Sequence, residues 1–242
     1  PALHAADNIM TFKLAVKTIA KRHGMHATFM PKPKSGVSGS GMHINMSLRK
    51  DGRNIFADET DRFGLSQDAY YFIGGLMKHV YSMTAITNPL VNSYKRLVSG
   101  FEAPLHIAWS VTNRSPLIRI PSSFGSGTRI ELRSPDSAAN PYLTIALCLA
   151  AGLDGIKNKI TPPENIQKNI FHMTEQEKEQ LHIKSLPTNL YDAVCAMERD
   201  AFIREILGEH ISNVYIGSKK DEWDRYCKTV TEWEVDTYLD KF

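Results

Sequence analysis

Two short stretches of the chain place chemically capable side chains on one face of a predicted β-strand. In residues 42–48, four apolar residues alternate with His43, Asn45 and Ser47. Alternate side chains of a strand point to opposite faces, so these three polar groups share a face while the apolar ones reach a core. A loop with glycines at positions 36, 39 and 41 precedes them. An imidazole, an amide and a hydroxyl beside such a loop indicate a ligand cavity.

The second stretch, residues 128–134, places a carboxylate between two arginines. Arg129, Glu131 and Arg133 share one face of this predicted strand, opposite Ile130 and Leu132. An isolated pattern of this kind is most often a ladder of surface ion pairs, which stabilises a protein very little. The alternative is a binding face, and the surrounding residues bear on that choice.

Arginines are concentrated around the second stretch. Between residues 96 and 133 there are two acids, Glu102 and Glu131, and five arginines: Arg96, Arg114, Arg119, Arg129 and Arg133. The guanidinium fork is suited to binding carboxylate and phosphate groups through two hydrogen bonds. Arginines on several strands without matching acids favour a polyanionic ligand. The alternative is a set of unrelated surface arginines.

His43 and Glu131 both lie on the polar face of a predicted strand. Imidazole with carboxylate is a common ligand pair for divalent metals, and Mg²⁺ or Mn²⁺ would also bridge to a phosphate. The alternative is a structural histidine that only completes a hydrogen bond. Two ligands are too few for such an ion, and we find no good third candidate in the sequence.

Composition excludes several classes of partner. The 242 residues include 29 basic and 26 acidic ones, a net charge of +3, without basic runs interleaved with aromatic residues. This balance argues against nucleic-acid binding. No apolar stretch approaches the roughly 20 residues that span a bilayer, and no signal peptide is evident. The cysteines, at 148, 195 and 227, are odd in number and widely spaced, which favours a reducing, cytoplasmic location.

The hydrophobic periodicity predicts an α+β fold with a largely antiparallel sheet and flanking helices, followed by a helical C-terminal part. We expect residues 1–160 to form the α/β core and 161–242 the helical part of the same domain. The predicted strands cover residues 27–30, 42–48, 106–112, 117–120 and 128–134. The predicted helices cover 7–23, starting at Asp7, 66–84, starting at Ser66, 140–155, 175–182, 189–207 and 218–240.

Several motifs, in order, resemble the C-terminal catalytic region of a type I glutamine synthetase of a Gram-positive-like branch. They are Met30-Pro-Lys-Pro33, Gly39-Ser-Gly-Met-His43, Asn92-Ser-Tyr-Lys-Arg-Leu97, Gly100-Phe-Glu-Ala-Pro104, Asn113-Arg-Ser115, Ile118-Arg-Ile-Pro121, Arg129-Ile-Glu-Leu-Arg133 and Ala138-Ala-Asn-Pro-Tyr142. The resemblance runs essentially end to end. It implies a ligase that joins ammonia to the γ-carboxylate of glutamate, with ATP as substrate and γ-glutamyl phosphate as intermediate.

The resemblance also implies a role for each candidate residue. His43 and Glu131 are similar to ligands of Mg²⁺ or Mn²⁺. Glu102 resembles an acid on a closing loop that takes a proton from ammonium, and Arg114 resembles the group that stabilises the transferring phosphoryl charge. The residues similar to nucleotide contacts are Asn45, Ser47, Arg114, Arg119 and Arg129. Those similar to glutamate contacts are Ser38, Gly39, Arg96, Glu102 and Arg133.

Some features of the family differ or are missing here. Ser38 stands where the family usually has Asn, and Ser99 where it usually has Pro. The N-terminal β-grasp domain and the first part of the catalytic domain, with the other metal carboxylates, are missing from these 242 residues. We therefore expect the chain to be inactive alone. The resemblance also implies that the complete family enzyme is a dodecamer. Two alternatives remain: an interaction or regulatory module that binds a transcription regulator, and a γ-glutamyl-amine (polyamine) ligase.

Overall fold

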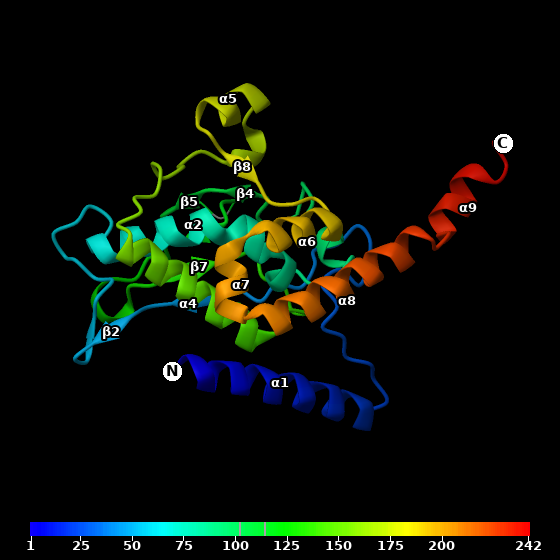
Figure 1. The fold of residues 1–242 in the computed structure, drawn as a ribbon, viewed down its shortest axis with the longest axis horizontal. Helices are drawn as coiled ribbons and strands as arrows, with labels where there is room; N and C mark the ends of the chain where they lie inside the picture. The colour runs from blue at the N-terminus through cyan, green and yellow to red at the C-terminus, as the bar shows by residue number, and fades with distance from the viewer. Residues whose placement is uncertain (102, 114) are drawn as a thin grey trace.

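Two long helices form the centre of the fold in the computed structural model, which describes residues 1–101, 103–113 and 115–242. Two predicted site residues, Glu102 and Arg114, lie outside the described residues. Helix α2 (Gln67–Thr87) packs along α4 (Pro141–Lys157), and Figure 1 shows them side by side in the middle of the molecule. Both begin at a capping side chain: that of Ser66 accepts a hydrogen bond from Ala69 N, and that of Asn140 accepts from Tyr142 N.

A four-stranded sheet lies against this helical layer and confirms the predicted α+β class. Its strands are β1 (Ile44–Met46), β7 (Ile130–Leu132), β6 (Ile118–Arg119) and β5 (Trp109–Ser110), in the order β1-β7-β6-β5. The β1–β7 and β7–β6 pairs are antiparallel, and β6–β5 is parallel. Ile118, Ile130 and Leu132 are fully buried in the core that also contains α2, as expected for the apolar face of the predicted strands.

Two short ribbons complete the β-structure of the described residues. Strands β2 (Arg49–Lys50) and β3 (Arg53–Asn54) form a hairpin, with positive φ angles at Asp51 (50°) and Gly52 (77°). Strand β4 (His106–Ile107) pairs antiparallel with β8 (Lys184–Ser185). The predicted strand at 106–112 is therefore divided between two sheets.

The N-terminal segment differs from the prediction. Helix α1 (Ala2–Arg22) begins before Asp7, so the predicted start at Asp7 is wrong, and the Asp7 carboxylate instead accepts a hydrogen bond from the Tyr142 hydroxyl at 2.7 Å. The helix packs against α4, yet Phe12 on its apolar face is 60% exposed. The predicted strand at residues 27–30 is also wrong, since no described strand pairs with it.

The C-terminal part is helical, as predicted, but more divided. The predicted helix 189–207 is interrupted where Asp200 caps the second of its two pieces, α6 (Leu190–Arg199) and α7 (Ala201–Leu207). The predicted helix 218–240 consists of the end of α8 (Glu209–Cys227) and of α9 (Glu232–Tyr238), which begins at a capping box on Thr231. Figure 1 shows α9 extending away from the body of the molecule.

The remaining helices are short: α3 (Ser93–Arg96), α5 (Glu175–Gln180) and the 3₁₀ turns η1 (Gly125–Gly127) and η2 (Ile170–His172). Helix α5 starts at a capping box formed by Thr174 and Glu177. Within the described parts of the chain, none of the helices combines the length and apolar character needed to cross a membrane.

Glycines allow α2 and α4 to approach each other closely. A Cβ added at Gly155 would collide with the Tyr71 carbonyl oxygen, and one at Gly75 with that of Ala151. We predict that Gly155→Ala lowers the free energy of unfolding by about 1–3 kcal/mol, because the overpacked helices must separate.

Gly217 in α8 is the matched control, because nothing lies within 4 Å of an added Cβ there. We expect Gly217→Ala to be neutral or to stabilise by up to ~1 kcal/mol, as replacing a helical glycine does. Urea unfolding of the two variants beside the wild type measures both values. Equal stability of Gly155→Ala and Gly217→Ala would contradict the account of the helix crossing.

Candidate active site

A small cavity collects most of the predicted glutamate-binding residues. Its volume is about 170 Å³, and it is lined by Ser38, Gly39, Gly41, His43, Arg96, Phe101, Ala103 and Arg133. These residues come from the glycine-rich loop, from α3, from the segment after α3 and from the end of β7. Four of the predicted glutamate contacts, at positions 38, 39, 96 and 133, therefore line one cavity, together with one predicted metal ligand.

The segment after β7 holds the Arg96 side chain in place. It is only 4% exposed, and its guanidinium donates hydrogen bonds from Nη1 to the Ser134 carbonyl at 2.7 Å and from Nη2 to the Arg133 carbonyl at 3.2 Å. A guanidinium has five N–H donors in a rigid fork. Fixing part of the fork on two carbonyls orients the rest of it relative to the cavity.

The glycine-rich loop lies directly on this arginine. A Cβ added at Gly41 would come within 2.6 Å of Arg96 Nη2 and 3.0 Å of His43 Nε2, and one at Gly39 would collide with the Pro31 carbonyl. The loop is fixed by hydrogen bonds from Ser40 N to Pro31 O and from Met42 N to Pro135 O, each 2.8 Å long. The glycines are therefore required by close approach, beyond the flexibility that the sequence indicates.

Next to the cavity, Glu131 on β7 contacts side chains of β6 and of the residue just before β1. Its carboxylate lies 3.1 Å from His43 Nδ1 and 3.2 Å from Arg119 Nη1, and the residue is 8% exposed. The interpretation of this stretch as a ladder of surface ion pairs is therefore wrong, because Glu131 is buried and bonds across strands. Burial, and then the positive charge of Arg133, lower the pKa of His43. The neutral imidazole that results is the form that binds metals.

His43 and Glu131 fit two positions of a divalent-metal site. A nitrogen and a carboxylate lie within hydrogen-bond distance on neighbouring elements, and their chemistry suits Mn²⁺ or Mg²⁺. In the part of the chain that the structure describes, no group of three or more His, Cys, Asp or Glu side chains is arranged to hold an ion. Further ligands would have to come from water, substrate or other residues.

The predicted nucleotide contacts extend along the sheet from this point. Asn45 faces Glu131 across the β1–β7 pair, and Glu131 faces Arg119 across β7–β6. Arg129 Nε donates to Asn45 Oδ1 at 3.1 Å, and Nη1 donates to Gly127 O at 3.2 Å. Ser47 lies just beyond the end of β1 and is exposed. Asn45, Glu131 and Arg119 are thus neighbours in the strand register and form a polar row, with Arg129 bonded to Asn45 at one end.

Sequence reasoning missed a lysine that connects the two sides of the cavity. Lys32 Nζ lies 3.5 Å from the centre of the Phe101 ring and donates a hydrogen bond to Val37 O. The Asn92 side chain fixes the Lys32 backbone, accepting from its N at 2.8 Å and donating to its O at 3.0 Å. The only signal in the sequence was the place of Lys32 in the Met30-Pro-Lys-Pro33 motif.

We predict that Lys32→Met loosens the segment around Phe101, because a cation over an aromatic ring contributes about 0.5–2 kcal/mol. Hydrogen exchange by mass spectrometry should show faster exchange in peptides covering residues 98–104. Lys34→Met is the matched control, since Lys34 is a nearby exposed lysine. The same exchange rates in both variants would show that Lys32 does not hold this segment.

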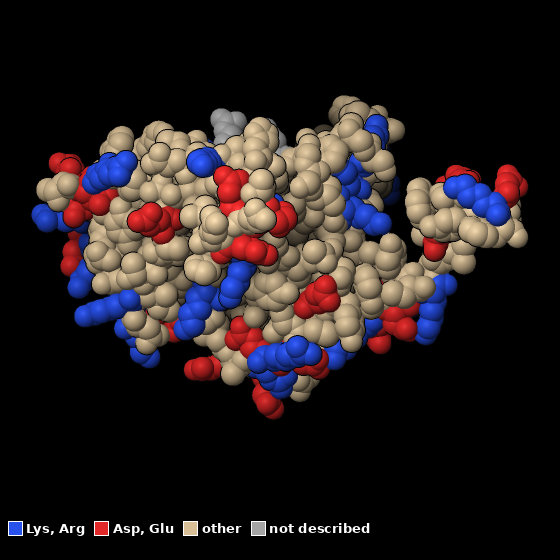
Figure 2. Space-filling view, turned by 90° about the horizontal axis from the view of Figure 1, so that it is seen from above, with Lys and Arg blue, Asp and Glu red and all other residues tan. Residues whose placement is uncertain are grey.

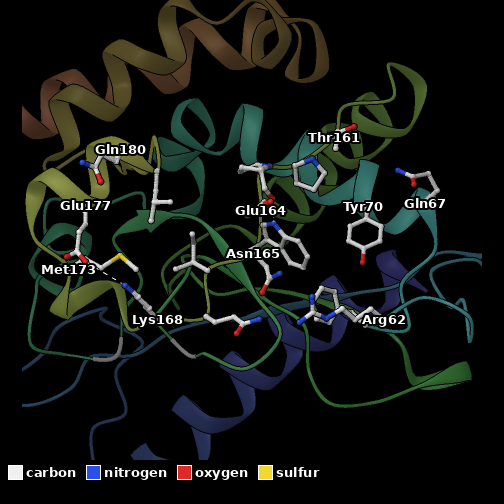
Figure 3. Close-up of a pocket in the computed structure, with 17 residues that line it drawn as sticks. Arg62, Gln67, Tyr70, Thr161, Glu164, Asn165, Lys168, Met173, Glu177 and Gln180 are labelled. Atoms are coloured by element: carbon white, nitrogen blue, oxygen red, sulfur yellow. Dashed lines mark hydrogen bonds and ion pairs between the residues drawn. The ribbon is translucent and has the colours of Figure 1, made fainter.

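A larger cavity lies elsewhere, between the start of α2 and residues 161–181. Its volume is about 890 Å³, and its lining includes Phe63, Tyr70 and Trp109 with an ion pair of Lys168 and Glu177 (Figure 3). Of the predicted site residues that the structure describes, none lines this cavity. On the face shown in Figure 2, acidic and basic side chains are interspersed. The candidate site residues that the structure describes are concentrated at the smaller cavity and the adjoining strands.

Comparison with known proteins identifies the class to which this fold and site belong. The family model described as "Glutamine synthetase, catalytic domain" matches residues 1–238. The chain is a member of the glutamine synthetase catalytic-domain family. This confirms the resemblance found in the sequence.

Individual relatives agree with the family assignment. The chain is 57% identical over 241 residues to a glutamine synthetase of Clostridium saccharobutylicum, covering 100% of this chain and 54% of the relative. It is 56% identical over 237 residues to a glutamine synthetase of Methanosarcina mazei, covering 98% and 53%. The chain thus spans about half the length of these curated relatives.

Solved structures are similar over nearly the whole chain. A structure of GmaS without ligand superposes with a TM-score of 0.87 at 42% identity, covering 99% of this chain and 54% of that one. A GmaS/ADP complex gives a TM-score of 0.89 at 42% identity, covering 99% and 55%.

Proposed function

We propose that this chain carries the glutamate- and nucleotide-binding part of a glutamate–ammonia ligase, which makes glutamine from glutamate, ammonia and ATP. The observation that carries the proposal is the shared location of two sets of groups. Arg96, Arg133 and Gly39 line one small cavity, and the row of Asn45, Glu131, Arg119 and Arg129 begins beside it. One set suits a small dicarboxylate and the other suits phosphates.

The proposed reaction has two steps. A γ-carboxylate oxygen of glutamate attacks the terminal phosphorus of ATP, and ADP leaves. Ammonium then loses a proton, and the resulting ammonia attacks the γ-carbonyl carbon of γ-glutamyl phosphate, displacing phosphate and releasing a second proton. Phosphoryl transfer depends mainly on positioning and on neutralising charge. In this proposal Arg96 and Arg133 hold the glutamate carboxylates, and Arg119 and Arg129 face the nucleotide.

The remaining roles are proposed from the family resemblance. Glu102 accepts the ammonium proton, and Arg114 stabilises charge on the transferring phosphoryl group. A divalent ion on His43 and Glu131 would supply positive charge to the phosphates. Since only two protein ligands lie there, we propose that full turnover needs further carboxylates, as the twofold longer relatives could supply. Such an enzyme would also be oligomeric, as the resemblance implies.

Binding to the 242-residue chain tests the central part of this proposal. We predict that Arg133→Ala weakens L-glutamate binding at least about tenfold, because a hydrogen bond to a charged group contributes about 1.5–3 kcal/mol. The affinity for Mg-ADP should change little. Isothermal titration calorimetry measures both affinities.

Arg62→Ala is the matched control, since Arg62 is an exposed arginine that lines the larger cavity. It should leave glutamate binding unchanged. Loss of glutamate binding in Arg62→Ala but not in Arg133→Ala would place the substrate in the other cavity. A folded chain that binds neither glutamate nor Mg-ADP would instead favour a non-catalytic interaction module.

The identity of the acceptor amine, ammonia or a larger amine, distinguishes two kinds of ligase. The same cavity could serve a γ-glutamyl-amine ligase, in which a larger amine replaces ammonia. Ser38, at the edge of the cavity, is smaller than the Asn expected from the family resemblance. Comparing ammonia with polyamines in a phosphate-release assay of an active, longer polypeptide separates the two ligases, and the proposal expects ammonia to be preferred.

A further inference from the structure

A buried polar cluster lies behind Arg96, on the side away from the cavity lining. Asp136, Asn88 and Ser93 are each 0% exposed, and none of them lines the cavity. Removing an ionised carboxylate from water costs several kcal/mol unless hydrogen bonds and an opposite charge compensate. The groups that bond the Asp136 carboxylate therefore indicate the role of this cluster.

The Asp136 carboxylate accepts hydrogen bonds from several directions. Asn88 Nδ2 donates to Oδ2 at 3.1 Å and Ala138 N donates to Oδ1 at 2.9 Å, while the Ser93 hydroxyl also bonds the carboxylate. The Asp136 backbone is fixed as well, because its N donates to Thr87 O at 3.1 Å. These bonds join the end of α2, the start of α3 and the segment after β7.

One carbonyl connects this cluster to the substrate cavity. Ser134 O accepts from Asn88 Nδ2 at 2.9 Å and from Arg96 Nη1 at 2.7 Å. Asn88 therefore bonds Asp136 and the carbonyl that holds the guanidinium at the same time. Any shift of Asp136 would move this carbonyl, and the direction of the Arg96 fork with it.

Electrostatics supports the same connection. Burial lowers the pKa of Arg96, and the negative charge of Asp136 is the largest influence that opposes this shift. Arg133, the second cation at the cavity, repels the Arg96 charge. Asp136 thus helps two buried arginines to lie together beside one cavity.

We propose that Asp136 is a positioning residue for the substrate, which acts through Asn88 and the Ser134 carbonyl to orient Arg96 without touching glutamate. The substrate named here rests on the proposed function. A neutral or apolar side chain would serve packing alone at lower cost, since buried ion pairs are weak sources of stability. Orientation of a substrate-binding cation accounts for a carboxylate at this depth.

The first test compares two ligands in Asp136→Asn, which keeps the shape of the side chain. We expect the Kd for L-glutamate to rise about tenfold and the Kd for Mg-ADP to stay within about twofold. Asp61→Asn is the matched control, because the Asp61 carboxylate likewise accepts backbone hydrogen bonds, from Phe63 N and Leu65 N, and does not line the cavity. Both affinities should be unchanged in that variant.

The second test does not require glutamate to bind. The Nη–H resonances of Arg96, assigned by their loss in Arg96→Lys, should exchange with solvent at least about tenfold faster in Asp136→Asn than in the wild type or Asp61→Asn, because their hydrogen bonds to Ser134 O and Arg133 O open more often. If Asp136→Asn does not fold, Ser93→Ala removes one bond to the carboxylate and should shift exchange in the same direction, about threefold.

The outcomes of the two tests are separable. Faster Arg96 exchange with selective loss of glutamate affinity supports the proposal. Unchanged Arg96 exchange, or equal loss of glutamate and Mg-ADP affinity, overturns it. If the wild type binds no glutamate, the proposed function fails, and the exchange rate still decides whether Asp136 orients Arg96.

Discussion

The buried guanidinium of Arg96 is the group on which the rest of the site depends. It bonds two carbonyls of the segment after β7, and the glycine-rich loop lies on it so closely that Gly41 has no room for a side chain. A cation this deeply buried is stable only where hydrogen bonds and compensating charge are already in place. The glycine-rich loop and the segment after β7 must therefore adopt one arrangement around Arg96, and this arrangement forms the cavity.

The larger architecture supports this arrangement. The closely packed helices α2 and α4 support the sheet from one side. The register of the sheet aligns Asn45, Glu131 and Arg119 across three strands. Arg96 follows α2 after a short segment, so the same helix layer positions both the cavity and the polar row. Binding of two ligands at adjoining places thus follows from one rigid core.

Much of this could be predicted from the sequence, because side-chain alternation is a local property. The polar faces of residues 42–48 and 128–134 and the predicted helix starts at 66 and 140 agree with the structure. Features that depend on contacts between distant segments could not be predicted from the sequence. The strand expected at 27–30 lacks a described partner, and the apolar pattern of α1 does not reveal what would cover it. The bonds of Lys32 and Asp136 likewise join residues far apart in the chain.

The measurement that tests the central claim most directly is a crystal structure of the chain grown with L-glutamate and Mg-ADP. The account predicts glutamate in the cavity of about 170 Å³, with its carboxylates on Arg96 and Arg133, and ADP phosphates beside His43, Glu131 and Arg119. Glutamate bound in the larger cavity, or a filled small cavity in which Arg96 makes no contact with the ligand, would contradict it.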